Sequence, residues 1–206
     1  MKSNPLVALC VVAVGLTGLC EKKSSAAIQA SAFCRRGPHD TMLVTDRGVD
    51  GLGVDWPLKR LRDRCPAARD TLYAWAEGSY PALQISFRGA TILAVQASDA
   101  GQPDLSAPAD FWIVSGDSVR LPSQLSLKAK WAALRSAYGG AVGQALDESL
   151  ETIDFTFCAL PRLRFRISAA GVDSTASLTD PASYPDSAHV RAVLILTKGN
   201  SVPSRC

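Results

Sequence analysis

The chain has 206 residues, 47% of them hydrophobic and 20% charged, with a mean hydropathy of +0.09. This composition excludes a disordered tail, and the length allows one domain or two small ones but not a large multidomain enzyme. The formal net charge is +3, but three of the 22 basic residues and one of the 19 acidic residues lie in the first 32 positions, which leaves +1 for the remainder. A nucleic-acid partner is therefore not expected.

The first segment of interest is the apolar run Pro5 to Leu19, which follows a single lysine. It is shorter than the roughly 20 residues that a membrane-spanning helix needs, so it predicts a secretory signal. Cleavage at a small-x-small site, at 24–26 or 30–32, would leave a periplasmic or secreted protein. Lipidation of Cys20 is the alternative, although Leu19 stands where a small residue is expected; only this outer-membrane lipoprotein form would contact a membrane.

Four cysteines follow this segment without a close pair. Their even number predicts two disulfides in an oxidising compartment, and their wide spacing does not fit a structural zinc site. Three pairings are possible, and the pairs that tie each end of the chain to its nearest element are favoured. The residues are Cys34 with Cys65 and Cys158 with Cys206. We expect no metal and no cofactor.

Two amphipathic helices are predicted. Over 126–138, apolar residues that include Trp131 and Leu134 recur at helical spacing, Ser126 can cap the first turn and Gly139 can end the last. A weaker copy spans 55–65 (DWPLKRLRDRC), with Asp55 as its cap and Pro57 in its first turn.

Each predicted helix precedes two alternating apolar segments, at 83–87 with 91–95 and at 153–157 with 163–167. Both pairs predict β-hairpins. The unbroken apolar run 190–197 predicts a strand covered on both faces. The expected fold is α+β: two helix-hairpin (αββ) repeats plus a C-terminal strand, in a mostly antiparallel sheet with the helices packed on one face.

The domain division follows from these elements. Residues 1–32 form the export and processing region, and 33–206 form a single α+β domain. Within that domain, repeat one covers about 41–98, repeat two about 115–170 and the closing strand about 189–197.

The segments GVDWPLKRLRDRC and QLSLKAKWAALRSAYGG, each followed by a hairpin, resemble the tandem helix-hairpin modules of β-lactamase inhibitor proteins. They are also similar to the modules of SmpA/OmlA-type outer-membrane assembly lipoproteins, over about 41–167. The first copy departs from the lipoprotein motif, with Asp and Pro where a small residue and a free N–H are expected. The resemblance implies a cell-envelope or secreted binding module, and it carries over no functional residue.

Few residues suggest catalysis. The sequence has no metalloprotease, phosphate-loop, dinucleotide or G-x-S-x-G motif. Ser187, His189 and Asp186 are too close in an extended chain to form a catalytic relay. The acidic group that includes Asp154 is expected to be a solvated loop. We therefore expect no enzyme; the alternative is a small secreted hydrolase with a site near His189.

The basic residues suggest binding instead. Arg162, Arg164 and Arg166 alternate with apolar residues, so they would share the open face of the sheet, where they could bind carboxylates or phosphates. Alternatively, this row solubilises the face and pairs with Asp154 across the hairpin. The expected function is an exported, non-catalytic binding module whose partner is an acidic protein or an anionic envelope polymer. A second basic cluster lies on the outer side of the first helix: Lys59, Arg60, Arg62 and Arg64.

Overall fold

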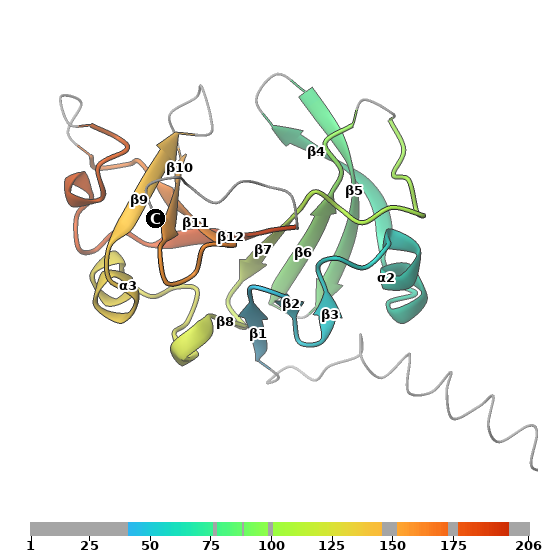
Figure 1. Ribbon diagram of the computed structural model, residues 1–206, viewed down its shortest axis with the longest axis horizontal. Helices are drawn as coiled ribbons and strands as arrows, with labels where there is room; N and C mark the ends of the chain where they lie inside the picture. The colour runs from blue at the N-terminus through green and yellow to red at the C-terminus, as the bar shows by residue number, and fades with distance from the viewer. Residues whose placement is uncertain are drawn as a thin grey trace, which may run out of the picture.

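The computed structural model describes residues 41–75, 78–87, 89–98, 101–145, 152–172 and 177–197. In these ranges the chain is mostly β, with twelve strands in two sheets and two short α-helices (Figure 1). The expected α+β fold, with helices packed on one face of a sheet, is therefore wrong. The helices are α2 (Leu58–Arg64) and α3 (Trp131–Tyr138), with single 3₁₀ turns at Pro122–Gln124 and Pro181–Ser183.

Eight strands form one antiparallel sheet in the order β4-β5-β6-β7-β12-β11-β10-β9 (Figure 1). The predicted closing strand, β12, lies at the centre, where it pairs with β7 on one side and β11 on the other. The bounds are β4 (Arg69–Trp75), β5 (Gly78–Phe87), β6 (Ala90–Val95), β7 (Phe111–Gly116), β9 (Ala141–Ala145), β10 (Thr152–Phe157), β11 (Leu163–Ser168) and β12 (Val190–Leu196).

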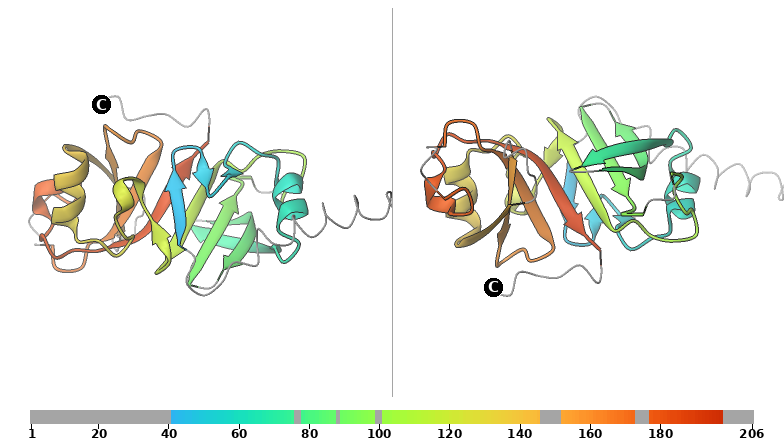
Figure 2. Two further views of the ribbon diagram at one scale, coloured as in Figure 1. Left: turned by 90° about the horizontal axis from the view of Figure 1, so that it is seen from below. Right: turned by 90° about the horizontal axis from the view of Figure 1, so that it is seen from above.

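A smaller sheet has the order β3-β2-β1-β8. Its strands are β1 (Met42–Thr45), β2 (Gly48–Val49), β3 (Leu52–Gly53) and β8 (Val119–Arg120). The pairing of β1 with β8 is parallel, with Met42 opposite Val119, and joins segments far apart in the sequence. This sheet lies between the two ends of the molecule that α2 and α3 occupy (Figure 2).

The two halves of the chain have a similar order of elements: short strands (three in the first half and one in the second), a helix, three antiparallel strands and then a central strand. The helices also begin in the same way. The first amide of α2, on Leu58, donates to the carbonyl of Ala107 at 2.9 Å, and that of α3, on Trp131, donates to the carbonyl of Ala188 at 2.7 Å. Both carbonyls belong to the connection that precedes the central strand of the same half. The predicted helix-hairpin unit is therefore too small, because each half contributes four strands to the large sheet.

Both helices start later than predicted. Residues 126–130 are not helical, because Ser126 forms a bridge with Arg120 and Lys130 forms one with His189. Asp55 does not cap α2; Pro57 occupies the cap position and no side chain caps the helix. Because backbone carbonyls satisfy the first amides of both helices, neither needs a side-chain cap.

One apolar core joins both halves. Trp131 and Leu134 of α3 are fully buried in it, as predicted, and Trp131 contacts the rings of Phe155 and Phe157 with centroids 5.0 and 5.5 Å apart. A second, smaller apolar cluster covers the opposite face of the large sheet. It consists of Ala82, Val95, Phe111, Ile113, Ala192, Leu194 and Leu196, with Tyr73, Trp75, Tyr80 and Leu93 packed against it. Because β12 contributes to both, the prediction that it is covered on both faces is confirmed.

Both predicted hairpins are present. Phe87 lies opposite Ala90 in the β5–β6 pair, and Phe155 lies opposite Phe165 in the β10–β11 pair. They are parts of the continuous large sheet rather than separate units.

The predicted export signal, Cys20, Cys34 and Cys206 lie outside the described residues. Cys65 and Cys158 are described, and both are disulfide-bonded. The pairing of each stays a prediction. Neither described helix is long enough to cross a membrane.

Candidate binding surface

The three predicted arginines lie on or next to β11, where buried and partly exposed residues alternate. Leu163, Phe165 and Ile167 face the main core. Arg164 and Arg166 therefore project from the opposite face of the sheet, as the alternation predicted. The three arginines nevertheless have different surroundings.

Arg166 is held by a buried carboxylate. Its Nε and Nη2 donate to the two oxygens of Asp154 at 2.9 and 3.2 Å, and its Nη1 donates to the Tyr73 hydroxyl at 2.7 Å. Burial alone would lower the pKa of Arg166, but the hydrogen bonds and charge of Asp154 outweigh burial and raise it. Asp154 is 1% exposed, so its expected place in a solvated loop is wrong. The alternative prediction, that the arginine row pairs with Asp154 across the hairpin, is confirmed for this arginine.

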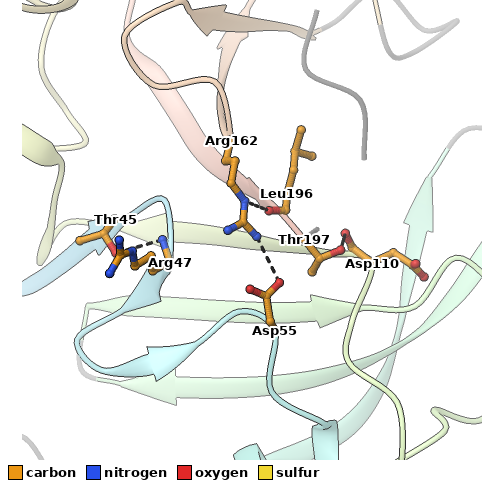
Figure 3. A network of polar contacts seen from close by, with 7 residues as sticks. All are labelled: Thr45, Arg47, Asp55, Asp110, Arg162, Leu196 and Thr197. Carbon is orange, nitrogen blue, oxygen red and sulfur yellow. Dashed lines mark hydrogen bonds and ion pairs between the residues drawn. The ribbon is translucent and has the colours of Figure 1, made fainter. Parts of the chain in front are cut away.

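Arg162 connects the two halves of the chain (Figure 3). Its Nε donates to the carbonyl of Leu196 at the end of β12, at 2.9 Å, and its Nη2 donates to Asp55 before α2, at 3.2 Å. Arg162 and Asp55 line a pocket of about 460 Å³ together with Arg47, Gly53 and Trp56.

Arg164 has no hydrogen-bond or ion-pair partner among the described residues, and its Nε is enclosed. Burial lowers the pKa of Arg164, and the charge of Asp154 only partly opposes this effect. The protein therefore keeps a partly buried guanidinium whose charge has little compensation. Such a group is costly unless a partner supplies an anion.

The basic cluster on α2 is largely engaged within the chain. Lys59 pairs with Asp63 one turn along the helix at 3.5 Å, and Arg62 forms an ion pair with Asp70. Arg64 lies at the last position of α2, where a positive charge interacts favourably with the helix dipole.

The remaining residue of that cluster, Arg60, lies over the Trp56 ring, 3.7 Å from the ring centroid. Trp56 in turn lies across Gly53, where any Cβ would stand 2.6 Å from the indole nitrogen. Trp56 therefore contacts one member of the α2 cluster and lines the same pocket as Arg162.

The hydrolase alternative depended on residues around His189. They border a second pocket, of about 660 Å³. The Nδ1 of His189 lies 3.0 Å from the backbone carbonyl of Lys128, while Asp186 forms an ion pair with Arg135. Ser187, His189 and Asp186 therefore do not form a hydrogen-bonded relay.

The sequence did not indicate Arg47, Trp56 or Arg191 as candidate site residues. Arg47 lies in a loop and Trp56 lies before a helix. Neither position belongs to a periodic pattern that would indicate where its side chain points. The sequence does show Arg191 as a charged residue inside a strand that was predicted to be covered on both faces. A charged side chain can reach the surface from such a strand only where the strand is irregular. Among the described residues no group of histidine, cysteine and acidic side chains could hold a metal ion.

Comparison with solved structures finds a shared fold. The model is similar to the crystal structure of the uncharacterized protein YfeY from Escherichia coli, with a TM-score of 0.52 and 11% sequence identity. The match covers 75% of this chain and 99% of that chain. At this identity the likeness concerns the fold alone. No protein-family model and no curated protein matches the sequence.

Proposed function

We propose that the protein is an exported, non-catalytic binding module of the cell envelope that binds an acidic partner at the arginine-lined face of its large sheet. The observation that supports this most directly is Arg164. It is a partly buried guanidinium without a hydrogen-bond partner among the described residues, between two arginines that are held in place.

The three arginines would not contribute equally. Arg166 and Arg162 already donate hydrogen bonds to Asp154, Tyr73, Asp55 and a backbone carbonyl. These bonds hold both side chains in place. A carboxylate or phosphate from a partner would give Arg164 the bidentate contact that it lacks. Because burial disfavours its charged form, compensation of this charge is worth more there than at an exposed arginine.

The arrangement around His189 supports a binding role rather than a catalytic one. Its Nδ1 faces a carbonyl, and the nearest acidic residue in the sequence, Asp186, is used by Arg135. The disulfide-bonded Cys65 and Cys158 support the proposed oxidising compartment.

The test uses protein labelled with ¹⁵N at arginine, and poly-glutamate as an acidic probe. The Nε–H signal of Arg164 should shift on titration, and Arg164→Gln should weaken binding at least fivefold, with a smaller salt dependence. Arg69→Gln is the matched control, because Arg69 is an exposed arginine on β4 at the far edge of the sheet. Equal losses in the two variants would mean that the binding is unspecific and would overturn the proposal.

A further inference from the structure

The 660 Å³ pocket lies where the two halves of the chain meet. Gly116, the last residue of β7, and Asp117, the next residue, come from the first half, and the other lining residues come from the second. Gly116 has a φ of 117°, and a Cβ there would stand 2.1 Å from the carbonyl oxygen of Gly89. This wall of the pocket is therefore fixed by close backbone contact.

The segment 185–189, most of which also lines the pocket, is held firmly as well. The amides of Trp131 and Ala132 donate to the carbonyls of Ala188 and Asp186, at 2.7 and 3.3 Å. The side chain of His189 is fixed by its 3.0 Å contact with the Lys128 carbonyl. A site whose walls are already in place loses little entropy when it binds a ligand.

A β-bulge places Arg191 in this pocket. In the β11–β12 pair, Arg166 lies opposite Ala192 and Ile167 lies opposite Val190, so Arg191 is the extra residue. Bulges redirect a side chain and are enriched next to functional sites. Arg191 is exposed, and it has no ion-pair or hydrogen-bond partner among the described residues.

The charges and surfaces of the pocket indicate what it can bind. Lys128 is compensated by Asp117 at 2.8 Å, which leaves Arg191 as the uncompensated charge of the lining. Two hydroxyls, Ser168 and Ser187, and the ring of His189 supply hydrogen-bonding groups. The apolar part of the lining consists of Leu127, Ala170, Pro185, Ala188 and Val190.

We infer that this pocket binds a small organic carboxylate with an apolar body, whose carboxylate meets Arg191. One unpaired positive charge matches a monoanion better than a dianion. The volume lies within the range of about 300–1,000 Å³ that is usual for small-molecule sites, so it suits an organic body rather than an inorganic ion. None of Arg162, Arg164 and Arg166 lines this pocket, and the inference does not depend on the proposed function.

The test measures the binding of three probes to the full mature chain by calorimetry. Octanoate carries both the charge and the apolar body, acetate carries the charge alone, and 1-octanol carries the body alone. Octanoate should bind at least tenfold more tightly than either of the others. Octanoate that binds no more tightly than 1-octanol would contradict the inference, because Arg191 would then contribute nothing.

Variants locate the binding. Arg191→Gln should weaken octanoate binding at least tenfold, and Ala170→Trp should block it by filling the pocket from an exposed position without a change of charge. Arg69→Gln and Arg164→Gln are the controls and should bind octanoate like the original protein. Unchanged binding in Ala170→Trp would place the carboxylate elsewhere and overturn the inference, whereas the poly-glutamate experiment would be unaffected.

Discussion

Asp154 is a fully buried acidic residue. Among the described residues, Arg166 is the only basic residue that forms an ion pair with it. The pair links strands β10 and β11 on the side of the sheet that faces away from the main core. Asp154 and Arg166 are direct partners in the register of these two strands. Alternation along β11 predicted the arginine side of this contact. The depth of Asp154 was not predictable, because it depends on how the rest of the sheet and Tyr73 of β4 cover it.

Asp154→Asn should lower the free energy of unfolding by about 3–5 kcal/mol, because it leaves a partly buried guanidinium without its counter-ion. Urea denaturation measures the difference. Asp117→Asn is the control, since Asp117 pairs with Lys128 at the surface, and it should cost less than about 1 kcal/mol. Similar losses in the two variants would show that burial of the first pair is unimportant.

Tyr184 permits a test with pH. Burial raises the pKa of Tyr184 to about 12, and its hydroxyl donates to the carbonyl of Leu178 at 3.0 Å. An unfolded tyrosine titrates near pH 10, so the folded state holds this proton more tightly and stability falls as the pH rises from about 10 to 12. The difference in tyrosinate absorbance between the original protein and Tyr184→Phe should have its midpoint near pH 12. A midpoint near 10 would contradict the burial of this hydroxyl.

At the scale of elements, the alternating segments and the unbroken apolar run of β12 were predictable, and the remaining strands were not. Apolar and polar residues alternate in the sequence at 83–87, 153–157 and 163–167, and in β11 burial alternates in the same way, because one side of the strand faces the core. β4 lies at the edge of the sheet and is half exposed along its length, while β7 is buried on both faces near its start, so neither carries a clear period of two. The strands that were not predicted enlarge the expected antiparallel sheet to eight strands.

The face of α3 was predicted correctly even though its start was not, and it can be tested by two substitutions. Leu134→Ala should cost about 2–5 kcal/mol of unfolding free energy, because it leaves a cavity in the core. Lys130→Ala, at an exposed position before the helix, should cost less than roughly 0.5 kcal/mol. Denaturant titrations that gave equal costs would mean that the helix presents a different face.

At the scale of the whole molecule, matching ion pairs link the two halves. Asp55, three residues before the first residue of α2, reaches Arg162 in the second half, and Lys128, three residues before the first residue of α3, reaches Asp117 after β7. The signs of the charges are reversed between the two pairs. This correspondence was invisible in the sequence, because it requires knowing that the ends of β7 and β12 lie near the other half.

Export is a prediction about the whole chain. Mass spectrometry of the native protein should show the loss of 19 to about 32 residues from the N-terminus and no alkylatable thiol among Cys34, Cys65, Cys158 and Cys206. An intact N-terminus with reactive thiols would contradict the proposed location. A diacylglyceryl mass on Cys20 would decide for the lipoprotein form.

The central place of β12 also governs the order in which the protein can fold. Two edges, those of β7 and β11, stay without partners until Val190–Leu196 has been synthesised and has inserted between them. Up to that moment the large sheet consists of two separate four- and three-stranded pieces with open edges and exposed apolar faces. The large sheet therefore cannot close before Val190–Leu196 is available, although the strands on both sides of it come earlier in the sequence.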